Sequence, residues 1–230
     1  GFPAVGDWRH DALEIAQQQE GAGLTRKAIL TRYVLANPYI WLLSLCYVLV
    51  YVVRAAINDW GNLYMSETLG VDLVTANSAV TMFELGGFIG ALVAGWGSDK
   101  LFNGNRGPMN LIFAAGILLS VGGLWLMPFA SYVMQAASFF TTGFFVFGPQ
   151  MLIGMAAAEC SHKEAAGAAT GFVGLFAYLG ASLSGWPLAQ VMDIWHWTGF
   201  FVVIAIAAGI SALLLLPFLN AQAPRTASEA

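Results

Sequence analysis

Long apolar stretches are the feature of this sequence that most limits how the chain can fold. A helix needs about 20 consecutive apolar residues to cross about 30 Å of hydrocarbon. Six stretches reach that length, are rich in Leu, Ala and Gly, and lack the alternation of a strand: 38–58 (extending to about 64), 75–97, 108–127, 132–159, 165–192 and 198–219. The sequence therefore predicts an all-α membrane protein with six transmembrane helices.

The scarcity of charged residues supports this prediction. Charged residues make up 10% of the 230 residues and hydrophobic residues 58%, with a mean hydropathy of +0.70. A soluble domain carries about 25% charged residues, because its surface faces water. Membrane helices approach one another closely at small residues. The pairs Gly86/Gly90 and Gly167/Gly171 have the spacing of such contacts, so we expect each pair to lie in a helix–helix interface.

The basic residues between the spans predict the orientation of the chain. Outside the spans, the Lys and Arg residues lie in four places. Arg9, Arg26, Lys27 and Arg32 precede the first span, and Arg225 follows the sixth. Lys100 and Arg106 lie between the second and third spans, and Lys163 lies between the fourth and fifth. The intervening segments 59–74, 128–131 and 193–197 contain neither Lys nor Arg. Basic loops stay on the cytoplasmic side of a membrane, so we expect both ends of this chain in the cytoplasm.

Two polar segments flank the predicted bundle of residues 38–219. Residues 1–37 are expected to form a cytoplasmic linker that lies along the membrane surface. Within it, Thr25 is a candidate N-cap for a basic amphipathic helix, and Asn37-Pro38 is expected to end that segment. Residues 220–230 are expected to form a short cytoplasmic tail.

Arg54 is the one basic residue inside a predicted span, where a charge costs at least a few kcal/mol unless it is compensated. Tyr47, Tyr51, Arg54 and Asn58 follow at positions i, i+4, i+7 and i+11, and therefore share one face of the first helix. Such a polar stripe is typical of residues that line a cavity. Alternatively, Arg54 snorkels to water near the outer end of the helix or pairs with Asp59.

Two other spans carry features that are unusual for a membrane helix. Asn77, Thr81 and Glu84 form a polar stripe on the second span, and a carboxylate there must be protonated, paired or wet. Glu84 is therefore a candidate proton carrier or partner of Arg54, with a structural role as an equal alternative. Gly148-Pro149 is expected to break the fourth span, either as a functional hinge or as a plain kink.

The remaining motifs argue against catalysis. Cys46 and Cys160 sit among apolar residues without a pairing pattern, and we interpret them as free buried thiols. The three histidines are scattered singly, so no metal site is expected. No hydrolase, metalloprotease or phosphate-loop motif occurs in the sequence. We therefore expect neither an enzyme nor a bound cofactor, and no nucleic-acid partner.

Several segments resemble a known family of membrane proteins. Residues 95–107 read GWGSDKLFNGNRG and are similar to the cytoplasmic loop motif of the major facilitator superfamily. In that motif an acidic residue and basic residues cap facing helix ends, and the matching positions here are Gly95, Asp99, Lys100 and Arg106. Residues 51–60 (YVVRAAINDW), 148–154 (GPQMLIG) and 165–180 (AAGAATGFVGLFAYLG) resemble its organophosphate:inorganic phosphate antiporter family. This resemblance implies the C-terminal half, helices seven to twelve, of a twelve-helix fold whose N-terminal six-helix half lies upstream.

The resemblance also implies two alternative functions. Residues 55–72 and 157–165 resemble the regulatory members of the family, which sense hexose phosphates, more than the carriers. This implies a bacterial inner-membrane receptor that binds external glucose 6-phosphate and activates a membrane-bound histidine kinase. The alternative is an antiporter that exchanges hexose phosphate or another organophosphate for inorganic phosphate. A membrane enzyme or a freestanding structural protein has no supporting motif.

Finally, the resemblance assigns roles to single residues. Arg54 matches the phosphate-binding arginine of the seventh family helix, and Tyr51 and Tyr178 match tyrosines that line the substrate cavity. Asn58 joins them as a candidate through its place on the Arg54 stripe. Phe147 stands where the carriers have a third cavity tyrosine. Because guanidinium binds phosphate bidentately, a sugar phosphate or inorganic phosphate is the expected ligand, at the interface of the two halves.

Overall fold

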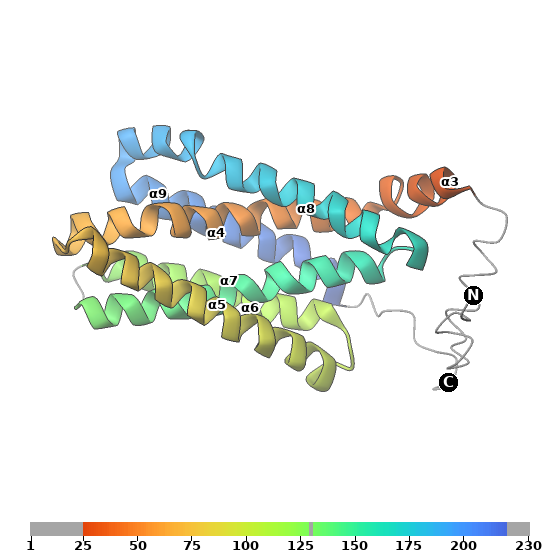
Figure 1. The fold of residues 1–230 in the computed structure, drawn as a ribbon, viewed down its shortest axis with the longest axis horizontal. Helices are drawn as coiled ribbons and strands as arrows, with labels where there is room; N and C mark the ends of the chain where they lie inside the picture. The colour runs from red at the N-terminus through yellow and green to blue at the C-terminus, as the bar shows by residue number, and fades with distance from the viewer. Residues whose placement is uncertain (1–24, 129–130, 220–230) are drawn as a thin grey trace.

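The computed structural model of the chain describes residues 25–128 and 131–219 (Figure 1). All of the regular elements in these residues are helical: α3 (Arg26–Leu30), η1 (Thr31–Leu35), α4 (Pro38–Leu69), α5 (Leu73–Leu101), α6 (Arg106–Leu126), α7 (Tyr132–Glu159), η2 (Lys163–Ala165), α8 (Ala166–Leu183), α9 (Trp186–Leu215) and η3 (Leu216–Leu219). The expected tail at 220–230 and most of the expected linker, residues 1–24, lie outside the described residues. Within the linker, Thr25 accepts a hydrogen bond from the Ala28 N–H and caps α3, as predicted.

Local sequence sets the ends of the long helices. Asn37 caps α4 with Pro38 at the first helical position, where the missing proline N–H has no helical partner to lose. Asp72 caps α5 by accepting a hydrogen bond from the Thr75 N–H at 2.8 Å, and this bond holds the pKa of the Asp72 carboxyl below its usual range. Helix α4 ends at Gly70 with φ of 66°, a left-handed conformation that glycine adopts without a steric penalty. The Asn37-Pro38 boundary lies where the sequence predicts it.

Six helical passes account for the apolar sequence. Among the described residues, five segments are long and apolar enough to cross a membrane, and the last of them runs from Lys163 to Leu219 over 57 residues. One straight helix of that length would extend about 85 Å, nearly three times the thickness of the hydrocarbon core. His196 interrupts it with φ of 50° and ψ of −146°, and Figure 1 shows α9 running back beside α4 toward the end of the bundle at which α8 begins. The predicted six-helix membrane fold is therefore confirmed.

The interruptions within the spans differ from those predicted. Helix α7 continues through Pro149, so the fourth span is not divided there; a kink at Gly148-Pro149 stays a prediction. A proline removes one backbone hydrogen bond, and the remaining hydrogen bonds and the packing of a long helix keep it helical on both sides of the proline. The fifth span is instead divided at Ser184 and Gly185, between α8 and α9. The indole N–H of Trp60 on α4 donates to the Ser184 carbonyl at 2.8 Å and so pairs one of the carbonyls at the end of α8.

Glycines allow α5 and α7 to pack at backbone contact. A Cβ atom at Gly86 or Gly90 would overlap the carbonyl of Phe140 or Phe144, respectively, on α7. The interface prediction for this pair is confirmed, and α5 and α7 form the most extensive pair among the described helices. Gly167 and Gly171 do not meet another helix of the described residues: both are exposed on α8, and nothing outside their own helix backbone lies within 4 Å of a Cβ built there, so an interface at this pair stays a prediction.

The packing leaves an apolar exterior around a buried centre. Helices α4, α8 and α9 run along one side of the molecule and α5, α6 and α7 along the other (Figure 1), and α4 also packs against α5 and α7. Phe83, Phe113 and Phe139 are fully buried between the helices. Large apolar side chains also point outward, among them Leu119 at 78% and Leu126 at 80% exposure. A soluble domain rarely exposes such continuous apolar surface, whereas lipid accommodates it.

Candidate functional site

The guanidinium of Arg54 lies between two aromatic rings near the middle of α4. Its central carbon is 5.5 Å from the centroid of the Tyr51 ring and 4.6 Å from that of Phe147 on α7. Both distances fall within the range of cation–π attraction, which strengthens where water is excluded. The rings fix the cation without using its N–H groups. Arg54 Nε is buried and has no hydrogen-bond partner among the described residues.

Glu84 on α5 provides the nearest negative charge to Arg54. One carboxylate oxygen of Glu84 lies 3.9 Å from Arg54 Nη2, with side-chain exposures of 45% and 27% respectively. This separation is too long for a hydrogen bond. The sequence left Glu84 as a proton carrier, a partner of Arg54 or a structural group, and its position beside the guanidinium fits the partner role. A loose, half-exposed ion pair contributes about 0–1 kcal/mol, so another anion can compete for the guanidinium.

The tyrosines expected near Arg54 lie beside it. The ring of Tyr51 is 4.8 Å from that of Tyr47 and 6.5 Å from that of Tyr178 on α8, measured between centroids. Tyr178 is 74% exposed, so its ring lies on the surface of this chain. Asn58 does not point to Arg54: its side chain is exposed and donates to Asp59 at 3.1 Å. The site therefore draws its polar and aromatic groups from four helices.

The ring of Phe147 fits against α5 because Gly87 has no side chain there. The ring lies directly against Gly87, where any Cβ atom would overlap it, and 5.6 Å from the Phe83 ring. A phenyl ring attracts a cation through its face as a phenol does. The lost hydroxyl therefore removes a hydrogen-bonding group while the aromatic platform under Arg54 remains.

These groups together suit a phosphate group. The Arg54 guanidinium offers a planar set of N–H donors, which matches two phosphate oxygens at once. Its aromatic neighbours exclude water from part of the cation and so strengthen its attraction for an anion. The buried, unpartnered Nε is a donor left to be satisfied, and native proteins retain few such groups.

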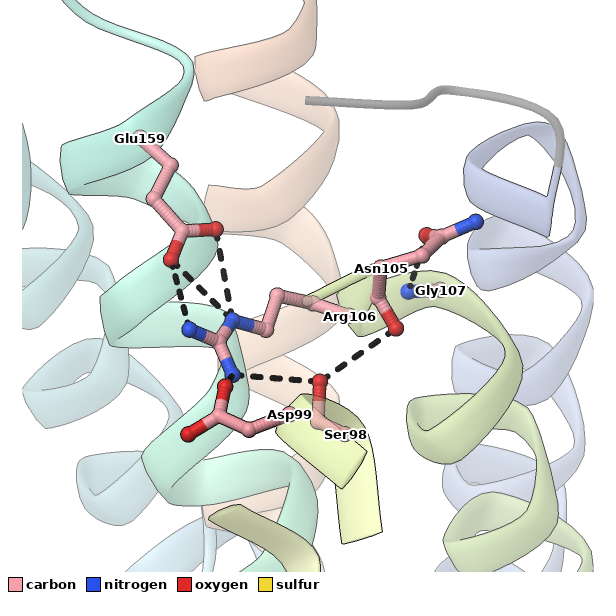
Figure 2. Close-up of polar contacts among 6 residues, drawn as sticks. All are labelled: Ser98, Asp99, Asn105, Arg106, Gly107 and Glu159. Carbon is pink, nitrogen blue, oxygen red and sulfur yellow. Dashed lines mark hydrogen bonds and ion pairs between the residues drawn. The ribbon is translucent and has the colours of Figure 1, made fainter. Parts of the chain in front are cut away.

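A second polar cluster joins the helices at the end of the bundle that carries the loop motif (Figure 2). Arg106, at the start of α6, donates to Asp99 of α5 at 2.5 Å and to Glu159 of α7 at 2.8 Å. It also donates to the Ser98 hydroxyl at 3.1 Å. One guanidinium thus links three helices, an arrangement that matches the proposed role of the motif in joining helix ends. Lys100 is exposed beside this cluster.

Sequence reasoning missed Ser98 and Glu159 as members of this cluster. Glu159 is the last residue of α7, and an acidic residue at the end of an apolar span next to a basic loop was the available signal. Gly95 of the motif is buried on α5, where a Cβ atom would lie 3.1 Å from the Met151 side chain of α7. The motif therefore combines one close packing position with a network of charges.

Comparison with known proteins identifies the family of this chain. A family model described as Major Facilitator Superfamily matches residues 8–185. The membrane sensor protein UhpC of Salmonella typhimurium is 92% identical over 230 residues, which are 100% of this chain and 52% of that protein. A probable hexose phosphate transport protein of Chlamydia pneumoniae is 47% identical over 100% of this chain and 53% of its own length. The hexose-6-phosphate:phosphate antiporter of Escherichia coli is 38% identical over 84% of this chain and 42% of its own length.

The chain spans about half the length of the curated relatives that it matches. Six helices are likewise half of a twelve-helix transporter fold. The chain therefore belongs to the Major Facilitator Superfamily and corresponds to the C-terminal half of that fold.

Proposed function

We propose that this chain is the C-terminal half of an inner-membrane sensor that binds external glucose 6-phosphate through Arg54 and signals to a membrane-bound histidine kinase. The observation that carries the proposal is the placement of the Arg54 guanidinium between Tyr51 and Phe147, with a buried N–H donor left unpaired. An anion with several oxygens would satisfy that donor and displace Glu84. The 92% identity to a protein named as a membrane sensor supports sensing as the activity.

The proposed ligand site has two halves. Arg54, Tyr51 and Tyr178 are the proposed contacts from this chain, with Glu84 and Phe147 beside them. A second arginine, from the upstream six-helix half, would bind the same phosphate group from the other side. Substrate sites of this fold lie at such an interface between repeats. Asn58 stays a candidate at the outer edge of the site, reached only if its bond to Asp59 opens.

In the proposed membrane topology, residues 38–219 span the inner membrane and residues 1–37 and 220–230 lie in the cytoplasm. The cluster of Asp99, Arg106 and Glu159 is then cytoplasmic. The site at Arg54 lies several helical turns away from this cluster, within the membrane. The positive-inside rule supports this orientation.

Antiport is the second candidate function. Relatives with 38% and 47% identity carry names that state hexose phosphate transport or antiport, and both functions would use the same arginine. Phe147 favours the sensor, because the expected carrier tyrosine is absent while the platform for Arg54 persists.

The test uses the full-length protein with both halves. Glucose 6-phosphate is supplied outside cells that carry a reporter for the kinase response, and the purified protein in vesicles is assayed for exchange of glucose 6-phosphate against labelled phosphate. The sensor predicts reporter induction without substantial exchange. Rapid exchange without induction would replace the sensor by the antiporter, and failure to bind either ligand would overturn both.

A further inference from the structure

Gln150 lies beside the Arg54 site and has no role in the function proposed above. It follows Pro149 on α7, and its backbone carbonyl accepts a hydrogen bond from the Tyr47 hydroxyl at 2.9 Å. Its side chain is different. The Oε1 atom is buried and has no hydrogen-bond partner among the described residues.

The contacts around Gln150 place it in a second layer of the same site. On α4, Tyr47 packs against Tyr51, whose ring lies next to Arg54. On α7, Phe147 and Gln150 are three residues apart, so they share one face and differ in height by about 4.5 Å. Arg54 contacts Phe147 between α4 and α7, and we call this pair the upper layer. About one helical turn away, Tyr47 contacts Gln150 between the same two helices, and we call this pair the lower layer.

The second layer lies on the side of Arg54 that leads to the charged cluster. Asn37, just before α4, donates to the carbonyl of Cys160, just after α7, at 2.9 Å. These two helix ends therefore meet at the end of the bundle that carries Glu159. Going from Arg54 to Tyr47 on α4, or from Phe147 to Gln150 on α7, leads toward that end. A ligand held by Arg54 and extending in this direction would reach the level of Tyr47 and Gln150.

The two layers offer complementary chemistry. The upper layer has an unpaired cationic donor, Arg54 Nε, and the lower layer has an unpaired neutral acceptor, Gln150 Oε1. An amide both accepts and donates hydrogen bonds, so it suits a hydroxyl group in either sense. Phosphate oxygens accept from the donors of Arg54, whereas the unpaired Oε1 of Gln150 needs a donor such as a sugar hydroxyl. A phosphorylated polyol or sugar has both kinds of group on one molecule, whereas inorganic phosphate has no need of the lower layer.

We propose that the side-chain amide of Gln150 is the hydroxyl-recognising subsite that distinguishes a sugar phosphate from inorganic phosphate. The subsite rests on the proposed function, because it needs the phosphate to be bound at Arg54. A site whose buried amide is paired only by a hydroxyl rejects ligands that lack the hydroxyl, since the amide is then left unsatisfied.

The test compares two ligands on the full-length protein. Gln150→Met keeps the length of the side chain and removes the amide, and Gln150→Leu serves as a second variant if the first folds poorly. Dissociation constants are measured for glucose 6-phosphate and for inorganic phosphate, with the melting temperature of each variant. We expect glucose 6-phosphate to bind about three- to tenfold more weakly, as for one lost neutral hydrogen bond, and phosphate affinity to stay within about twofold.

Asn110→Leu is the matched control. Asn110 on α6 also has a buried amide oxygen without a partner among the described residues, but it lies near the start of α6, at the end of the bundle that carries Arg106. Its substitution should leave the ratio of the two affinities unchanged. An unchanged ratio in both Gln150 variants, or equal weakening of both ligands, would overturn the subsite while leaving phosphate binding at Arg54 intact. A parent protein that binds neither ligand would overturn the proposed function itself, and the subsite with it.

Discussion

The guanidinium carbon of Arg54 lies 4.6 Å from the centroid of the Phe147 ring, the closer of its two aromatic contacts. Arg54 belongs to α4 and Phe147 to α7, so this contact joins two helices in the middle of the bundle. It positions a charge without occupying its hydrogen-bond donors. An arginine held in this way is oriented before any ligand arrives, and less side-chain entropy is lost on binding.

Phe147→Leu should therefore weaken ligand binding although the side chain is uncharged and apolar. Removing the ring removes a cation–π contact of about 0.5–2 kcal/mol, which corresponds to roughly a 2- to 30-fold loss of affinity for glucose 6-phosphate. The measurement is titration of the purified full-length variant. Phe147→Tyr is the control, because it keeps the ring, and it should bind within about threefold of the parent. Equal behaviour of the leucine and tyrosine variants would contradict the platform role.

Glu84→Gln should strengthen phosphate binding. The carboxylate lies 3.9 Å from the guanidinium and is half exposed, so it competes with the ligand while adding little stability. Releasing a pair of about 0–1 kcal/mol raises affinity by at most about fivefold. Titration with inorganic phosphate at low salt checks the sign, because high salt screens the pair. Weaker binding in the glutamine variant would instead make Glu84 part of the binding machinery.

The interface between α5 and α7 gives a prediction about stability. Gly90→Leu should abolish correct folding or sharply lower the melting temperature, because a Cβ atom at Gly90 would overlap the Phe144 carbonyl and backbone cannot yield as a flexible side chain can. Gly122→Ala on α6 is the matched control, since nothing in the described residues outside its own helix backbone lies within 4 Å of a Cβ there. Alanine at an unobstructed helical position is neutral or stabilising by up to about 1 kcal/mol. Fluorescence-detected size exclusion and thermal unfolding in detergent measure both variants, and a well-folded Gly90→Leu protein would refute the contact.

Periodicity and length were sufficient to predict most of this fold. The six spans, the Asn37-Pro38 boundary and the Gly86/Gly90 interface follow from apolar length, proline geometry and the spacing of small residues. Gly167 and Gly171 have the same spacing and yet face outward. Spacing alone states that two glycines share a helix face, and it does not state which neighbour covers that face.

The interruptions were harder to predict, because tertiary partners decide them. Pro149 removes one hydrogen bond, and α7 continues. The division at Ser184 and Gly185 has a partner far away in the sequence, the indole of Trp60. In the site, the helical stripe identified Tyr51 and Arg54 correctly as neighbours. It missed Gln150 and Glu159, whose importance depends on contacts between helices that no single-helix pattern contains.

The orientation of the bundle can be tested by labelling single cysteines. In a full-length protein without Cys46 and Cys160, Lys100→Cys and Lys163→Cys should react with an impermeant maleimide only from the cytoplasmic side. Asp72→Cys, before α5, should react only from the outside. Burial, together with the neighbouring Glu159, raises the pKa of the native Cys160 thiol, which keeps its reactivity low even where it is retained. Labelling of Lys100→Cys and Lys163→Cys from opposite sides would overturn the topology.

Arg54→Lys tests the proposed phosphate site most directly. Lysine retains the charge, so the energy of membrane insertion barely changes, but it replaces a planar pair of donors by a single point contact. The loss of one charge-assisted hydrogen bond weakens binding by about 1.5–3 kcal/mol, or roughly 10- to 150-fold. The full-length variant should therefore insert normally and lose most of its affinity for both glucose 6-phosphate and inorganic phosphate, together with reporter induction. Arg32→Lys is the control, because Arg32 also packs over an aromatic ring, that of Tyr33, but lies on η1, before the first span. If Arg54 only snorkels to water, lysine substitutes without loss, and a variant that binds and signals like the parent would remove Arg54 from the ligand site.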